Sequence, residues 1–203
     1  MENILIICAM PKEAKFIAEK LNMKQLKDNL YKSKNITLLI SGIGKQRTAI
    51  SLTEYLCQNI KPDKIINIGY AGSTDIEIGK WVNITKSYNY EWEIPGEEKY
   101  SMLDFGNQNL QTLQNNNIKK VDCYSAECFV TSTNIEEHVA FDMELHSIAI
   151  LCDKYSIPLY ALKKISDNLN LENFYENINK QDIFELHSCL KLLEEENIIT
   201  TID

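Results

Sequence analysis

Three carboxylates in this 203-residue chain stand next to apolar runs, in positions where a side chain could do acid–base chemistry. Glu13 follows the first such run, Glu144 precedes a second, and Asp167 ends a third. A carboxylate in apolar surroundings costs free energy unless it is paired or used in chemistry. The pattern therefore favours a site in which acidic groups hold a ligand or transfer protons.

Plain structural roles explain the same residues equally well at this level. Pro11 suits the first turn of a helix, and Glu13 in that turn suits the helix dipole. Asp142 and His146 are four residues apart, which is the spacing of a surface contact on a helix. Asp167 could simply cap the chain after its strand. The local pattern does not choose between these roles and catalysis.

Composition limits the classes of function. With 44% apolar residues and no Pro/Gly/Ser-rich linker, we expect residues 1–203 to form one domain. The net charge is −8 and the basic residues are scattered, which argues against nucleic acid as a partner. The start of the chain lacks the features of a signal peptide, and no segment approaches the roughly 20 apolar residues of a membrane span. We therefore expect a cytoplasmic protein with no membrane partner.

The six cysteines lie in apolar segments and are expected to be buried free thiols. Cys123 and Cys128, with His138 and His146 beyond them, have the residue types of a zinc site but the spacing of no common one. We expect no metal and no cofactor.

Short apolar runs rich in β-branched residues alternate with amphipathic stretches, which predicts an α/β fold. The predicted strands are 3–8, 36–41, 64–69, 80–85, 126–132 and 158–166, and the predicted helices are 11–22, 46–60, 107–116, 139–155 and 181–196. Residues 86–106 are predicted to form a long loop rich in aromatic residues. Ligands of open α/β sheets lie beyond the carboxyl ends of strands, so the site is expected there.

Six segments, in this order, resemble the nucleoside phosphorylase/hydrolase superfamily, and most of all its 5'-methylthioadenosine/S-adenosylhomocysteine nucleosidase branch. They are "AMPKEAK", "SGIGK", "IINIGYAGS", "AECFVTS", "FDMELHSIA" and "IPLYALKKISDN". The resemblance extends from residue 3 to about residue 168. It implies a purine nucleoside phosphorylase-like fold, in which a single domain has a central, mixed and twisted β-sheet flanked by helices.

The resemblance also implies an activity, the hydrolysis of the N-glycosidic bond of 5'-substituted adenine nucleosides with release of adenine. Asp167 would protonate the purine, Glu13 would activate the attacking water, and Glu144 would hold the ribose hydroxyls. The other substrate contacts that the resemblance implies are Met143, Phe129, Val130, Ala71, Gly72 and Ser166. A homodimer is implied as well, with the aromatic residues Tyr88, Tyr90, Trp92 and Tyr100 near the partner's site.

Some positions depart from the pattern of this family. Tyr70 and Lys164 stand where small residues are usual, Ser73 replaces a glycine, and Ala126–Glu127 replaces a Gly-Asp pair. Tyr70 is bulky enough to crowd the ribose pocket.

Three alternatives to this hydrolase stay open. A phosphorylase of the same superfamily would bind phosphate through several arginines, whereas this chain has only Arg47. A futalosine-type hydrolase would share the same carboxylates. A non-catalytic nucleoside-binding relative is indicated by Tyr70, although the presence of all three carboxylates argues against it.

Overall fold

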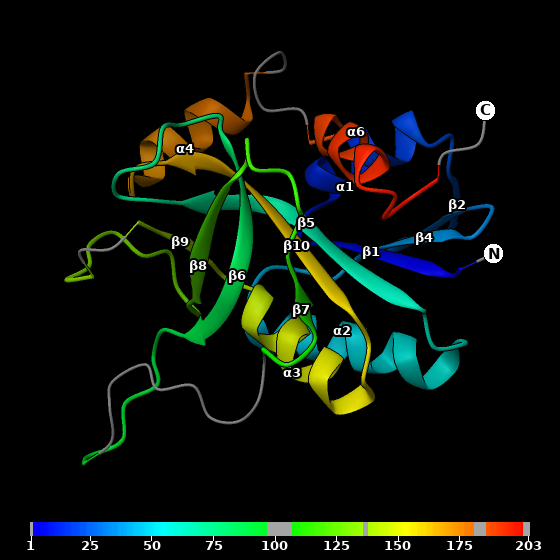
Figure 1. Ribbon diagram of the computed structural model, residues 1–203, viewed down its shortest axis with the longest axis horizontal. Coiled ribbons are helices and arrows are strands. Elements are labelled where there is room, and N and C mark those ends of the chain that lie inside the picture. Colours follow the sequence, from blue (N-terminus) through cyan, green and yellow to red (C-terminus); the bar gives the residue numbers. More distant parts are fainter. Residues whose placement is uncertain (1, 97–106, 136–137, 181–185, 201–203) are drawn as a thin grey trace.

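One mixed β-sheet with helices on both faces makes up the protein, as the computed structural model shows (Figure 1). It describes residues 2–96, 107–135, 138–180 and 186–200. The strands are β1 (Ile4–Cys8), β2 (Lys24–Lys27), β3 (Leu30–Ser33), β4 (Ile36–Ile40), β5 (Lys64–Gly72), β6 (Trp81–Asn89), β7 (Leu110–Gln111), β8 (Lys119–Ser125), β9 (Val139–Asp142) and β10 (Leu159–Asp167). The helices are α1 (Pro11–Lys20), α2 (Lys45–Gln58), α3 (Leu145–Tyr155), α4 (Leu171–Ile178) and α6 (Ser188–Glu195). The predicted α/β class and mixed sheet are confirmed.

Parallel strands form the centre of the sheet. β1 lies between β4 and β5 and is parallel to both. All of its residues, and all of those in β4, are buried, which is why these strands are continuous apolar runs rather than alternating ones. α1 and α6 cover one face of the sheet, and α2 and α3 cover the other (Figure 1).

Beside this centre, five strands pair with one another in a closed circuit. β5 pairs with β10, β10 with β6, β6 with β8, β8 with β9, and β9 returns to β5. Gly72 at the end of β5 pairs with both Phe141 and Asp167. A register shift between Ile165 and Asp167 changes the direction of the last side chain of β10. The ends of β5, β9 and β10, which carry most of the predicted site, therefore meet at one point.

Three predicted elements are wrong. Residues 126–132 form no strand, because the strand is the preceding segment β8, whose alternate residues Val121 and Cys123 are buried. Residues 107–116 form no helix but turns and the short strand β7. The predicted helix 139–155 is a strand followed by a helix, since Val139–Asp142 pair with β8 and β5 before α3 begins.

The predicted aromatic loop is shorter than expected, because β6 continues to Asn89. Tyr88 stacks on Tyr124 with ring centroids 4.8 Å apart, and Tyr90 packs on Phe141 at 5.7 Å. These rings serve the packing of their own chain. Residues 97–106, and with them Tyr100, lie outside the described residues, as do residues 181–185 of the last predicted helix.

Within the part of the chain that the structure describes, no helix has the length and apolar character needed to cross a membrane.

Candidate active site

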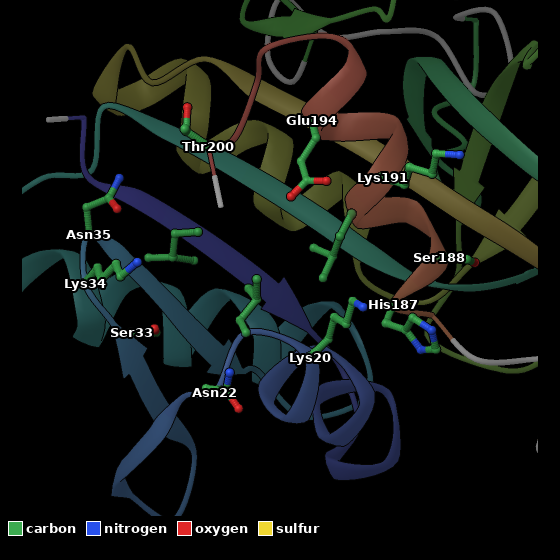
Figure 2. A pocket seen from close by; sticks show the side chains of 13 residues that line it. Lys20, Asn22, Ser33, Lys34, Asn35, His187, Ser188, Lys191, Glu194 and Thr200 are labelled. Atoms are coloured by element: carbon green, nitrogen blue, oxygen red, sulfur yellow. The ribbon is translucent and has the colours of Figure 1, made fainter. Parts of the chain in front are cut away.

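A large cavity lies away from the predicted carboxylates. It has a volume of about 810 Å³ and lies between the end of α1, the turn from β3 to β4, and α6 (Figure 2). Surface side chains such as Lys20, Asn35, Lys191 and Glu194 line it, and none of the predicted site residues does. The chemistry must be sought instead where β5, β9 and β10 end.

Glu13 folds back from the first turn of α1 over the loop that follows β1. Its Oε2 accepts hydrogen bonds from the backbone N–H groups of Ala9 and Met10, each at 2.8 Å, and its Oε1 accepts one from Tyr70 N at 3.1 Å. Burial raises the pKa of Glu13, although these hydrogen bonds and the charge of Lys163 oppose the shift. Glu13 is thus both a helix-capping residue and a buried carboxylate suited to accept a proton.

Lys163 lies among the carboxylates, and the sequence analysis missed it. Its Nζ is 2.7 Å from Asp142 Oδ2, and both side chains are buried. A Cβ added at Gly69 would lie 2.9 Å from Glu13 Oε1 and 3.6 Å from Lys163 Nζ, so Gly69 leaves the room that both groups use. Burial disfavours the ammonium ion, but the charges of Asp142 and Glu144 outweigh it and raise the pKa of Lys163.

Asp142 connects this lysine to α3. Besides Lys163, it accepts hydrogen bonds from Ser125 Oγ at 2.5 Å and from Leu145 N at 3.0 Å. Burial opposes ionisation, yet Lys163 and these donors lower the pKa of Asp142. The predicted surface contact with His146 is wrong, because Asp142 is buried at the end of a strand and His146 Nδ1 lies 3.3 Å from Ser87 Oγ instead.

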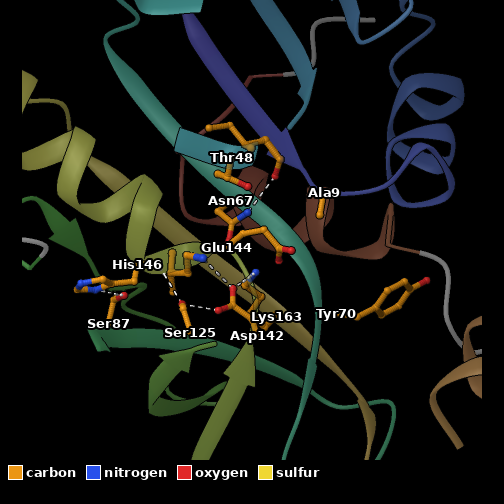
Figure 3. A network of polar contacts seen from close by, with 12 residues as sticks. Ala9, Thr48, Asn67, Tyr70, Ser87, Ser125, Asp142, Glu144, His146 and Lys163 are labelled. Carbon is orange, nitrogen blue, oxygen red and sulfur yellow. Dashed lines mark hydrogen bonds and ion pairs between the residues drawn. The ribbon is translucent and has the colours of Figure 1, made fainter. Parts of the chain in front are cut away.

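Glu144 lies beside this ion pair, as Figure 3 shows. Its Oε1 accepts a hydrogen bond from Gly44 N, at the start of α2, at 3.0 Å. Burial and the negative charge of Asp142 raise the pKa of Glu144 to about 8. A carboxyl group held this way can exchange hydrogen bonds with hydroxyl groups in either protonation state.

Asp167 is the last residue of β10 and is 1% exposed. Its Oδ2 accepts a hydrogen bond from Ser166 Oγ at 2.8 Å, whereas its buried Oδ1 accepts none from the described residues. Burial raises the pKa of Asp167, although the Ser166 hydroxyl and the backbone N–H groups of Leu169 and Asn170 oppose the shift. A buried oxygen without a donor is costly unless a ligand or a proton satisfies it. Gly72 makes room for this oxygen, since a Cβ there would lie 2.8 Å from it.

A narrow crevice of about 30 Å³ runs past Asp167. Four other predicted site residues line it, namely Gly72, Phe129, Val130 and Met143. Ala71 and Ser166 lie behind it, where Ser166 Oγ also donates to Ala71 O at 3.2 Å. Glu13 and Glu144 do not line the crevice but lie on the side of Lys163. Asp142, the partner of Lys163, also lines the crevice and so connects it to the cluster that holds Glu13 and Glu144.

Comparison with known proteins identifies the family. The profile of the phosphorylase superfamily matches residues 3–185. The chain belongs to the phosphorylase superfamily. The 5'-methylthioadenosine/S-adenosylhomocysteine nucleosidase of Buchnera aphidicola (subsp. Acyrthosiphon pisum, strain Tuc7) is 30% identical over 208 residues, which cover 89% of this chain and 88% of that protein. The protein of the same name from Bacillus cereus (strain G9842) is 25% identical over 229 residues, covering 95% and 99%.

Solved structures share the fold. A Helicobacter pylori MTAN mutant with 5'-methylthioadenosine in the active site has a TM-score of 0.79 at 20% identity, and the match covers 97% of this chain and 99% of that one. The native futalosine hydrolase of Helicobacter pylori has a TM-score of 0.78 at 20% identity, with 96% and 98% covered. The predicted purine nucleoside phosphorylase-like fold is confirmed.

Three of the residues that depart from the family pattern have contacts of their own in this member of the phosphorylase superfamily. The ring of Tyr70 points away from Glu144 and Asp142 (Figure 3), so it does not crowd that side of the site as expected. Lys164 Nζ lies 5.6 Å from the centre of the Trp81 ring. Glu127 accepts a hydrogen bond from Gln46 N at 3.0 Å, in the first turn of α2.

Lys163→Met is expected to destabilise the protein by about 3–5 kcal/mol, because it leaves the buried Asp142 without its counter-ion. The double variant Lys163→Met/Asp142→Asn removes both charges and should recover most of this loss. Lys154→Met, at an exposed position on α3, is the control and should change stability by less than about 0.5 kcal/mol. Urea denaturation measures all three, and a loss below about 1 kcal/mol for the single variant would contradict the assignment.

Proposed function

We propose that this protein hydrolyses the N-glycosidic bond of 5'-substituted adenine nucleosides, such as methylthioadenosine and S-adenosylhomocysteine, and releases adenine. The observation that carries the proposal is Asp167, a buried carboxyl with a raised pKa whose Oδ1 lacks a donor among the described residues and borders the crevice. Relatives at 25–30% identity that carry the nucleosidase name support the choice of substrate.

Asp167 is the general acid in this proposal. As the bond between the ribose C1' and the purine N9 breaks, its electron pair moves into the base, and Asp167 delivers a proton to N7. A raised pKa keeps the carboxyl protonated closer to neutral pH, where it can serve as an acid. Phe129 stacks on the base, the Val130 backbone faces the purine edge, and Gly72, Ala71 and Ser166 shape the wall around Asp167.

Glu13 and Glu144 act on the sugar side. Glu13 removes a proton from the water that attacks C1', and Glu144 binds the 2'- and 3'-hydroxyls while Met143 packs on the ribose. The transition state resembles an oxocarbenium ion with positive charge on the ribose, so the carboxylates of the cluster stabilise it electrostatically. Lys163 prevents their mutual repulsion from becoming excessive, because it neutralises Asp142.

Water fits this site better than phosphate does. A helix N-terminus attracts anions, but carboxylates already occupy that of α2: Glu144 binds Gly44 N and Glu127 binds Gln46 N. Glu13 occupies the N–H groups of Ala9 and Met10 in the same way. The one arginine, Arg47, is exposed on α2. A phosphate ion would find the N–H groups at both positions already bonded to carboxyl groups of the protein.

The proposed reaction should therefore proceed without phosphate. Purified protein is incubated with methylthioadenosine in phosphate-free buffer and in the same buffer with millimolar phosphate, and adenine and the sugar product are measured. We expect equal adenine release in both and a free 5'-methylthioribose. Turnover only with phosphate, with a ribose 1-phosphate as product, would show a phosphorylase, and no adenine in either buffer would refute the proposed enzyme.

Asp167→Asn should reduce kcat by roughly 100- to 10,000-fold, because the amide keeps the shape but supplies no proton. Substrate binding should change little, since the interaction strengthens mainly in the transition state. Asp153→Asn on α3 is the control, because Asp153 is not among the predicted site residues and accepts hydrogen bonds from the 108–109 segment. If folded Asp167→Asn protein lost less than about threefold in kcat, Asp167 would not be the acid.

We further propose that the protein works in the cytoplasm as a homodimer and contributes to methionine salvage. Ile50 on α2 and Ile43 just before it are 68% and 45% exposed, next to Gly44, which binds Glu144. Exposed aliphatic residues beside a site are suited to an interface. Light scattering at micromolar concentration should give twice the chain mass of 23.4 kDa, and a fully active monomer would refute the dimer.

A further inference from the structure

Three aromatic rings run in contact from the centre of the sheet to the crevice. The Tyr70 and Phe174 rings meet edge to face with centroids 6.4 Å apart, and the Phe174 and Phe129 rings lie 5.8 Å apart at 59°. Both distances are within the range in which aromatic pairs attract. The rings come from β5, from α4 and from the loop after β8, so the contacts connect three separate elements.

Tyr70 is the fixed end of this series. It belongs to β5, is 6% exposed and packs in the same core cluster as Ile66 and Ile68 of that strand. Its backbone N–H, rather than its ring, donates to Glu13. The ring points away from Glu144 (Figure 3). Burial and the charge of Glu13 raise the pKa of the Tyr70 phenol, so its hydroxyl group interacts with Glu13 while its ring packs on Phe174. Tyr70→Phe removes the hydroxyl group and keeps the ring, and therefore separates the two effects.

The position of Phe174 depends on the contact of its ring with Tyr70. One side of α4 packs on the rest of the protein, and Asn177 and Ile178 on that side are buried. Leu171 and Tyr175 of the same helix are 44% and 56% exposed. Asn177 Nδ2 donates to Ser166 O at 2.8 Å and so attaches the end of α4 to the strand of Asp167. Phe174 lies near the middle of the helix and contacts the rings of Tyr70 and Tyr175, the latter at 5.4 Å between centroids. Tyr70 is buried, whereas Tyr175 is exposed, so Tyr70 is the ring that fixes Phe174 to the protein.

We propose that Tyr70 is a positioning residue for the base: it holds Phe174 in place, and Phe174 in turn sets the position of the Phe129 ring at the crevice. The inference rests on the proposed function, in which Phe129 stacks on the purine. Tyr70 thereby tightens the binding of substrate and transition state alike and takes no part in proton transfer.

The test separates binding from chemistry. Tyr70→Leu fills much of the space without an aromatic ring, and it should raise KM for methylthioadenosine about tenfold, the size expected for a weakened aromatic contact with the base. Its kcat should stay within about threefold, because the backbone N–H that binds Glu13 remains. Tyr70→Phe keeps the ring and should restore a KM close to that of the unmodified protein.

Tyr160→Leu is the matched control, since Tyr160 is a partly buried tyrosine that packs against the same core cluster. It should leave KM within twofold at a comparable loss of stability. An unchanged KM in Tyr70→Leu, an equal rise in Tyr160→Leu, or a fall in kcat as large as the rise in KM would overturn the inference.

Calorimetric binding of methylthioadenosine to the same variants distinguishes this inference from the proposed function. If the unmodified protein binds the nucleoside but releases no adenine, the proposed hydrolysis fails, and a tenfold weaker affinity in Tyr70→Leu still supports the role of Tyr70. If the unmodified protein hydrolyses the nucleoside and Tyr70→Leu binds it equally well, only the role of Tyr70 fails.

Discussion

A buried ammonium group among carboxylates is the interaction on which this site depends. Lys163 pairs with Asp142, and its charge also acts on Glu13 and Glu144. Three acids within one small apolar region would repel one another, and each would tend to stay neutral. The lysine allows Asp142 to ionise and thereby to hold the start of α3, while Glu144 keeps a pKa of about 8. The charge of Lys163 thus allows an ionised Asp142 and a Glu144 with a raised pKa to lie close together in one site.

Strand ends give these groups their separate environments. Asp167 lies beyond the register shift of β10, beside Gly72, and borders a crevice lined by apolar side chains and Asp142. Glu13 comes from a helix that is joined to β1 by two residues, and three backbone N–H groups donate hydrogen bonds to it. Burial raises the pKa of both carboxyl groups, but Glu13 accepts three backbone hydrogen bonds and lies near Lys163, whereas Asp167 Oδ1 has no donor among the described residues. Such a division suits an acid and a base that act on opposite sides of one bond.

Much of this arrangement can be predicted from the sequence, for identifiable reasons. The apolar runs of β1 and β4 are continuous because both faces of the sheet are covered, and a carboxylate after such a run lies at the edge where ligands bind. Lys163 was not predictable in this way, because Lys163 and Lys164 are adjacent in one strand and look alike. Only the pairing of β10 with both β5 and β6 shows where each side chain lies.

Short or charged strands account for the other errors in the predicted secondary structure. Val139–Asp142 is too short to show a period of its own and was joined to α3, and Lys119, Lys120 and Asp122 hide the alternation of β8. The hairpin of β2 and β3 carries lysines along an exposed edge and was not predicted at all. In each of these cases pairing with a neighbouring strand, rather than local propensity, decides the structure.

The ring of five paired strands has a consequence for the motions of the protein. An edge strand of an open sheet is paired on one side and can detach there. β5 and β10 are each paired on both sides with strands of the closed circuit. Peeling either strand away therefore breaks two ladders at once. We expect the amide hydrogens of these two strands to exchange with solvent only in openings close to global unfolding, while α4 and the loop of Phe129, attached outside the ring, exchange through smaller fluctuations. The acid would then sit on the slowest-exchanging part of the fold and the base-stacking ring on a faster one.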